Sequence, residues 1–225
     1  MDAERLRALL EQVVSGAIPI PDAAEELARL PFAEVSGDLA PHTRVDHHRA
    51  VRCGFPEVIF CQSKTPDQVA SVAQEILSRS DVLLGTRADR GQFEAVARRV
   101  NDARWLETPR LIVVDRRENP PCEGHVVVAT GGTADTPVAE EAAACAELMG
   151  CRVTRLYDVG VAGVHRLLAH QDTLRDARVI IAVAGMEGAL PSVIAGLVDV
   201  PLVAVPTSVG YGANFGGVSA LLTML

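Results

Sequence analysis

The sequence has few aromatic residues, no excess of positive charge and no long hydrophobic run. Aromatic side chains make up 4% of the 225 residues, and together with 18 glycines this favours α/β packing over an aromatic-rich β fold. The formal net charge of −8 argues against binding to duplex nucleic acid, because such binding is dominated by neutralisation of phosphates. No apolar run approaches the roughly 20 residues of a membrane span, and no secretory signal pattern is present. We therefore expect a cytoplasmic protein that binds neither nucleic acid nor membrane.

The cysteines and histidines do not define a metal site. The five cysteines are odd in number and show neither C-x-x-C spacing nor a disulfide framework. Three histidines, His42, His47 and His48, leave two interpretations open: a metal site, or polar residues that face solvent or a nucleotide. No acid or thiol at fixed helical spacing completes a metal site, which favours the second interpretation.

Residues 1–122 are predicted to form a smaller α/β domain. After two amphipathic helices, one ending at Gly16 and one starting at Pro21, a strand is expected over Ala33–Asp38. Thr65-Pro-Asp-Gln68 has the pattern of a capping box with proline at the first helical position. The expected order of strand, helix, strand, helix and strand covers residues 57–61, 65–78, 81–86, 91–100 and 110–114. The charged, proline-containing stretch 115–122 then predicts a domain boundary.

Residues 123–225 are predicted to form a parallel, doubly wound α/β sheet. Four strands alternate with helices, as expected for repeated right-handed βαβ units. The strands are expected at 125–129, 152–157, 178–184 and 202–206, and the helices at 137–149, 164–176, 191–197 and from 218 onward.

Three loops of this second domain are expected to meet at the carboxyl ends of the strands, where open α/β sheets bind ligands. They are residues 131–135, 186–189 and 208–217. Their glycines let backbone amides approach a ligand, and the helix that starts near Pro137 offers its positive end to an anion. A phosphorylated or nucleotide ligand is therefore predicted.

Four positions carry the expected chemistry. Glu187 lies between two glycines that do not demand an acid, which indicates a general acid or base. Arg166, next to His165, is expected to bind phosphate. Asp135 leaves two alternatives open, a helix cap and a ligand contact, which are compatible. Tyr211 is expected either to stack on a ring or to cover the core.

The chain closely resembles the LarB family over most of its length. The residues that carry the resemblance are Phe55-Pro-Glu-Val-Ile-Phe60, Lys64-Thr-Pro66, Gly132-Thr-Ala-Asp-Thr-Pro-Val-Ala-Glu-Glu-Ala142, Asp158-Val-Gly-Val-Ala-Gly-Val-His-Arg166, Gly185-Met-Glu-Gly-Ala-Leu-Pro191 and Pro206-Thr-Ser-Val-Gly-Tyr-Gly212.

The resemblance implies a PurE-like second domain with flavodoxin-like layering and a specific activity. That activity is the carboxylation of nicotinic acid adenine dinucleotide by CO2 or bicarbonate, with hydrolysis of its phosphoanhydride and release of AMP. Mg²⁺ is implied as a helper, no tightly bound organic cofactor is expected, and a homo-oligomer is expected. Glu187 matches the family's catalytic acid. The implied substrate-binding residues are Gly132, Thr133, Asp135, Asp158, His165, Arg166, Ser208, Gly210 and Tyr211.

Two departures from the family pattern affect what we expect. The family's nucleophilic cysteine lies in an Asn-Ser-Cys stretch after the helix that Ser219–Leu225 begins, and the 225-residue sequence ends at Leu225. A chain that ends at Leu225, without this cysteine, is expected to bind the dinucleotide without carboxylating it. In addition, Ala134 replaces a serine usual in the family.

Two other functions remain open. One is a PurE-type aminoimidazole ribonucleotide carboxylase or mutase, whose phosphate-binding His-Arg pair is matched by His165 and Arg166. Its catalytic histidine, however, aligns with Ala189. The other is a catalytically silent nucleotide-binding form.

Overall fold

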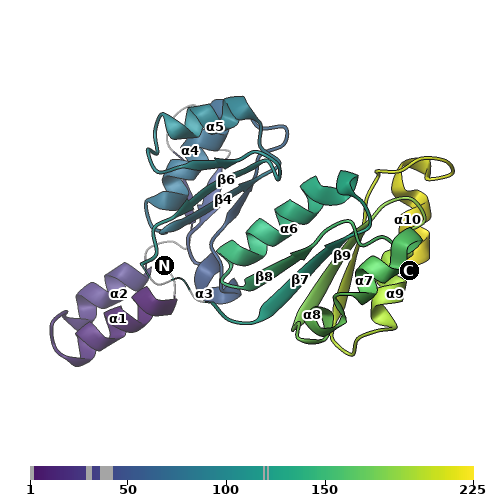
Figure 1. The fold of residues 1–225 in the computed structure, drawn as a ribbon. Coiled ribbons are helices and arrows are strands. Elements are labelled where there is room, and N and C mark those ends of the chain that lie inside the picture. Colours follow the sequence, from purple (N-terminus) through teal and green to yellow (C-terminus); the bar gives the residue numbers. More distant parts are fainter. Residues whose placement is uncertain (1–2, 29–31, 36–42, 119, 121) are drawn as a thin grey trace. The chain divides into compact units, whose positions relative to one another are not determined.

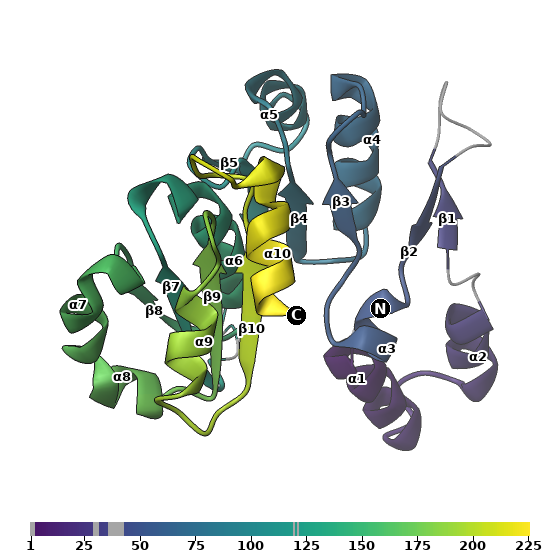
Figure 2. The same ribbon diagram turned by 90° about the vertical axis from the view of Figure 1, so that its right-hand side faces the viewer.

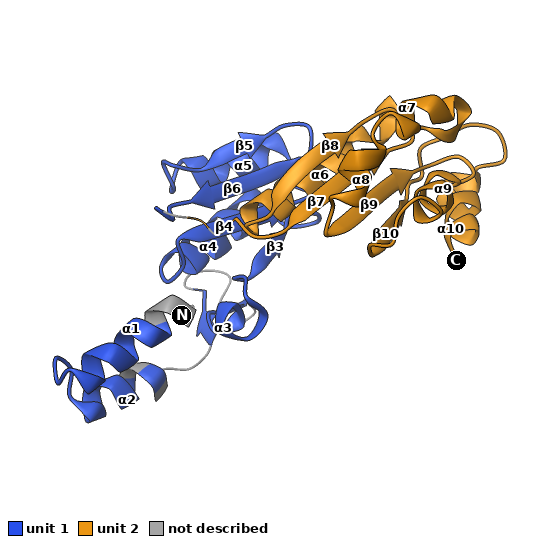
Figure 3. Ribbon diagram, turned by 60° about the horizontal axis from the view of Figure 1, so that its bottom comes forward, with its two compact units in different colours: residues 1–118 blue, residues 119–225 orange. Residues whose placement is uncertain are grey.

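The computed structural model describes residues 3–28, 32–35, 43–118, 120 and 122–225. Two compact units divide the chain, residues 1–118 and residues 119–225 (Figure 3). None of the helices in the described ranges is long and apolar enough to cross a membrane.

Unit 1, residues 1–118, contains a two-stranded antiparallel ribbon, β1–β2, and a four-stranded sheet in the order β3-β4-β6-β5. Its elements are α1 (Ala3–Val14), α2 (Ile20–Ala28), β1 (Phe32–Glu34), β2 (Arg44–Asp46), α3 (Arg49–Cys53), β3 (Val58–Phe60), α4 (Pro66–Leu77), β4 (Val82–Thr86), α5 (Arg90–Ala97), β5 (Arg104–Leu106) and β6 (Leu111–Asp115) (Figure 1). Residues 36–38 of the predicted strand, and His42, lie outside the described residues.

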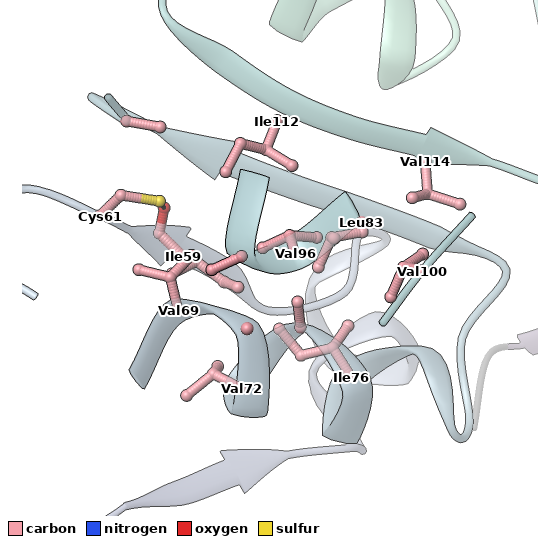
Figure 4. Packing of buried hydrophobic residues seen from close by; sticks show 14 of the residues in the cluster. Ile59, Cys61, Val69, Val72, Ile76, Leu83, Val96, Val100, Ile112 and Val114 are labelled. Carbon is pink, nitrogen blue, oxygen red and sulfur yellow. Dashed lines mark hydrogen bonds between the residues drawn. The ribbon is translucent and has the colours of Figure 1, made fainter. Parts of the chain in front are cut away.

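The predicted capping box of α4 is confirmed. The Thr65 side chain accepts a hydrogen bond from the Gln68 amide, and the Gln68 side chain accepts one from the Thr65 amide. The buried face of α4 packs on the sheet in the core drawn in Figure 4, where Val69 and Ile76 lie toward Ile59 and Leu83. The start of α4 is therefore fixed locally, and its position is fixed by the apolar stripe.

Two strands of unit 1, β2 and β5, were not predicted from the sequence. β3 and β4 are parallel, but β6 runs antiparallel to both β4 and β5. β5 spans Arg104–Leu106, three residues that are at most half-buried. So short a segment carries too little alternation to be recognised as a strand, yet it makes β6 part of a hairpin.

Unit 2, residues 119–225, confirms the predicted parallel α/β sheet. Its elements are β7 (His125–Thr130), α6 (Thr136–Leu148), β8 (Arg152–Leu156), α7 (Val164–Leu168), α8 (Gln171–Arg175), β9 (Val179–Ala184), α9 (Leu190–Ala195), β10 (Leu202–Pro206) and α10 (Val218–Met224). The strand order is β10-β9-β7-β8, and all three pairings are parallel. Val127 of β7 pairs with Ile180 of β9, so the longest apolar strands lie at the centre.

Helices cover both faces of this sheet. Ala139 and Ala143 of α6 pack on one face with Val128 and Val183. Leucines and isoleucines of α7, α8 and α9 pack on the other face, and α10 lies beside β10 (Figure 2). The predicted single helix over 164–176 is wrong, because His170 adopts φ −111° and ψ 20° and interrupts it between α7 and α8.

Candidate functional site

Four loops at the carboxyl ends of the unit 2 strands enclose a cavity of about 340 Å³. They follow β7, β8, β9 and β10, which is the rim that the sequence predicts. Of the residues implied as ligand contacts or as the catalytic acid, these line the cavity: Gly132, Thr133, Asp135, Arg166, Glu187, Gly210 and Tyr211. Asp158, His165 and Ser208 are exposed and do not belong to its lining.

Two glycines allow the loops to approach one another. A Cβ atom on Gly185 would lie 1.8 Å from the carbonyl oxygen of Val209, and one on Gly160 would lie 2.3 Å from that of Gly131. The Met186 amide also donates to the Val209 oxygen at 3.1 Å. The cavity wall therefore depends on backbone contacts that any larger side chain would push apart.

Asp135 links two of the loops. It is only 5% exposed, and its two oxygens have different partners: Oδ2 accepts from the Gly132 amide at 3.1 Å and Oδ1 from the Thr207 hydroxyl at 2.7 Å. Asp135 stands at the N-cap position, directly before α6, but its side chain makes no capping bond to that helix. The helix-cap alternative is therefore wrong, and the carboxylate instead joins the loop after β7 to the end of β10.

Replacing Thr207 with valine is expected to destabilise the protein by about 1–3 kcal/mol, because Asp135 Oδ1 loses its donor while it stays buried. Urea unfolding measures the change. Thr223→Val is the matched control, since its hydroxyl bonds the Ser219 carbonyl on the exposed surface of α10. Equal stabilities of the two variants would contradict the structural role of the Thr207–Asp135 bond.

Arg166 is held at the cavity by a partner that does not line it. Its guanidinium forms an ion pair with the Asp158 carboxylate, and it packs against Gly163, where a Cβ would lie 2.7 Å from Arg166 Nε. Asp158 has a positive φ of 58°, and its amide donates to the buried Thr130 hydroxyl at 3.0 Å. Both groups of the pair are partly exposed, so it orients Arg166 more than it stabilises the fold.

Glu187 is the free acid of the site. It lies in the turn closed by the Gly188 amide, which donates to the Gly185 carbonyl at 2.9 Å. The side chain is exposed, lines the cavity, and makes no hydrogen bond or ion pair with any residue that the structure describes. A carboxylate without a protein partner is available to a ligand.

The loop after β10 is ordered by a residue that the sequence analysis missed. Asn214 is buried; its Nδ2 donates to the Ser208 carbonyl at 3.0 Å and its Oδ1 accepts from the Gly217 amide at 2.9 Å. An asparagine before two glycines is a turn signal that could have indicated this role. Tyr211 of the same loop is 78% exposed and lines the cavity, which excludes the alternative that it covers the core.

The described cysteines and histidines add no group to this cavity. Burial raises the pKa of Cys61 and of Cys145 to about 11, which favours the protonated thiol. His47 of unit 1 is buried, with its Nε2 2.9 Å from Glu75 Oε1, and burial lowers its pKa against the opposing effect of Glu75. Across the described ranges no three His, Cys, Asp or Glu side chains form a group that could hold a metal ion.

Comparisons with known proteins agree with this architecture. Residues 125–225 match the AIR carboxylase family, and residues 37–117 match the LarB/PurE-like N-terminal domain. An uncharacterized protein of Methanocaldococcus jannaschii is 35% identical over 230 residues, which cover 99% of this chain and 87% of that protein. The fold of unit 2 and these matches define a carboxylase-type enzyme for nucleotide substrates. The two matches together show that the chain belongs to the LarB family.

Proposed function

We propose that the protein carboxylates nicotinic acid adenine dinucleotide at carbon 5 of its pyridinium ring and hydrolyses the phosphoanhydride. The products are pyridinium-3,5-biscarboxylic acid mononucleotide and AMP, and the reaction opens the biosynthesis of the nickel-pincer nucleotide cofactor. The observation that carries the proposal is Glu187, a carboxylate without a described partner on the cavity of an AIR carboxylase-like unit.

The ring chemistry explains why an acid is needed there. A pyridinium ring is too electron-poor to attack CO2, but addition of a thiolate gives a dienamine whose carbon 5 is nucleophilic. Carbon 5 then forms a bond to CO2. Removal of its proton by Glu187 returns the C–H electron pair to the ring as the thiolate leaves with the C–S pair. We propose that the thiolate comes from the Asn-Ser-Cys stretch that follows position 225 in the family.

The remaining cavity groups suit a phosphorylated substrate. Arg166 offers a guanidinium that matches phosphate geometry, and Asp158 keeps it oriented. The loop Gly131–Asp135 leads into the 13-residue helix α6, whose amino end favours an anion. Thr133 and Gly210 line the same cavity. These groups support substrate binding, while Glu187 supports the proton transfer.

The PurE-type alternative is less well supported. Ala189 lines the cavity at the position where that reaction needs a histidine, and its methyl group cannot carry a proton. A role for Mg²⁺ in the reaction is a proposal that rests on the resemblance to the LarB family. The described residues do not form a cage for it, and no step above passes through a metal ion.

The proposed activity is tested with a chain extended by the family's Asn-Ser-Cys stretch and given the dinucleotide and carbon-13-labelled CO2. Labelled biscarboxylate and AMP are expected, detected by mass spectrometry. The same extended chain with that cysteine changed to serine is the control and is expected to bind the dinucleotide without forming product. Turnover of aminoimidazole ribonucleotide, with no conversion of the dinucleotide by the extended chain, would contradict the proposal.

We also propose that the protein forms a homo-oligomer through α10 and β10. Val218, Leu221 and Leu222 are 50%, 44% and 69% exposed at helical spacing on α10, and Val203 of the edge strand β10 is 50% exposed. Large apolar side chains gathered in this way are typical of an interface.

Leu222→Glu is expected to weaken self-association by at least about tenfold, because it places a charge in the apolar face. Light scattering after size-exclusion chromatography measures the mass. Met149→Glu, which changes an apolar residue that is 48% exposed at the end of α6, is the control. A parent chain that is monomeric at all concentrations would overturn the proposal.

A further inference from the structure

Unit 1 has a rim of its own where the parallel strands β3 and β4 end side by side (Figure 2). Phe60 and Thr86 are the last paired residues, and the Cys61 amide donates to the Thr86 carbonyl at 2.9 Å. The carboxyl ends of parallel strands are where α/β sheets bind ligands. None of the chemistry assigned above uses this rim.

Hydrogen bonds hold three loops together there. The buried Gln92 side chain donates to the carbonyl oxygens of Cys61 at 2.9 Å and Lys64 at 2.7 Å. The Ala88 amide donates to the Arg110 carbonyl at 3.0 Å, and Arg110 Nε donates back to the Ala88 carbonyl at 2.8 Å. The loop after β3, the loop after β4 and the β5–β6 hairpin therefore form one surface.

Each of the three loops brings a cation to this surface: Lys64, Arg87 and Arg110. All three are exposed, and neither Lys64 nor Arg110 forms an ion pair with a carboxylate of the described residues. The loops contain two acids. Asp89 Oδ1 accepts from the Gln92 amide at 2.8 Å as the cap of α5, and Glu107 begins the turn that Arg110 ends, with its carbonyl accepting from the Arg110 amide at 3.2 Å. In a chain with a net charge of −8, this concentration of cations suits an anion.

The backbone of the same loops is strained. Ser63, Arg87 and Arg110 have φ of 67°, 53° and 55°, so each loop holds one non-glycine residue in the left-handed region. In unit 2, Asp158 and Met186 have φ of 58° and 48° in loops of the candidate site. Such conformations are disfavoured for residues other than glycine and cluster where loops are shaped around a ligand.

Phe60 supplies an aromatic surface beside the cations. Its side chain is 53% exposed at the end of β3, and Lys64 Nζ lies 5.9 Å from the ring centroid. An exposed aromatic face next to positive charge is the combination that binds a nucleobase and its phosphate.

We propose that this rim of unit 1 binds a nucleoside monophosphate, with the base against Phe60 and the phosphate between Lys64, Arg87 and Arg110. The inference deepens the proposed function, on which the identity of the nucleotide rests, because an adenylate is one half of the proposed dinucleotide.

The test is photolabelling of the full 225-residue chain with 8-azido-AMP, followed by peptide mapping and calorimetric titration with AMP. Label is expected on the peptide around Phe60, with protection by AMP. Lys64→Gln is expected to weaken AMP binding to this rim by about tenfold or more, the effect of one charge-assisted phosphate contact. Arg98→Gln, the same charge change at the other end of α5, is the control and leaves binding unchanged.

Label confined to the peptide around Tyr211, with AMP affinity unaffected by Lys64→Gln and Arg87→Gln, would overturn this inference and leave the proposed function intact. Equal protection by inorganic phosphate, together with unchanged AMP affinity in Phe60→Leu, would also overturn it, because the site would not recognise a nucleoside. If unit 1 is labelled as expected but the cysteine-bearing chain does not carboxylate the dinucleotide, the proposed function fails and the rim assignment stands.

Discussion

Replacing Glu187 with glutamine is expected to lower the carboxylation rate of a cysteine-bearing chain by about 10²–10⁴-fold, the usual contribution of a general acid or base. The amide keeps the size of the side chain and cannot accept the ring proton. Because Glu187 makes no bond to a described residue, the fold and most of the substrate affinity should remain. The rates are measured with labelled CO2, and the affinity by calorimetry.

The course of the reaction separates a proton-transfer role from a structural one. Thiolate addition precedes the step that Glu187 serves, so mass spectrometry should detect substrate trapped on the thiol of Glu187→Gln. Phosphoanhydride hydrolysis removes no ring proton and should fall less, unless it waits for carboxylation. Glu123→Gln, an exposed acid preceding the amino end of β7, is the matched control. A Glu187→Gln chain that carboxylates at the parent rate but has lost thermal stability would show that the acid is structural.

The sequence predicted unit 2 well because its strands are long and apolar. Segments such as Val179–Ala184 can only be buried on both faces, and right-handed βαβ connections then bring the following loops to one rim. The same reasoning predicts that Thr133, Arg166 and Glu187 lie at one rim, and all three line one cavity. It also places His165 there, which the structure leaves exposed beside the cavity lining.

What the sequence could not predict depends on contacts between distant residues. The Thr207–Asp135 bond joins positions 72 residues apart, and no local pattern marks threonine as the partner of that acid. Asp158 reaches the site only through its ion pair with Arg166, from a residue whose backbone is left-handed. The three-residue strand β5 is defined by its pairing with β6 more than by its own residues. In each case contacts between residues that are distant in the sequence determine the structure, because the local sequence favours no single conformation strongly.

Gly185 is the position in the cavity wall where a single methyl group is expected to do most damage. Its Cβ would lie 1.8 Å from the Val209 oxygen and 2.8 Å from Thr207 Oγ1, the hydroxyl that donates to Asp135. Relief of the first contact to an ordinary 3.4 Å requires the loop after β10 to move by more than an ångström. That displacement would also pull Thr207 away from Asp135, so the loops after β7 and β10 would no longer be joined by this hydrogen bond.

Gly185→Ala is therefore expected to destabilise unit 2 by about 1–3 kcal/mol, as overpacking does, and to lower kcat/KM of the cysteine-bearing chain by about 10²-fold, the effect of misplacing a site by about 1 Å. The dinucleotide affinity of the 225-residue chain should fall with it. Gly196→Ala is the control, because its Cβ would meet nothing nearer than the Val193 oxygen at 3.5 Å; its stability should stay the same or rise slightly. Urea unfolding measures the stability of both variants, and calorimetry measures their affinity for the dinucleotide. If Gly185→Ala binds the dinucleotide as tightly as Gly196→Ala does, the loops after β9 and β10 do not shape the binding site.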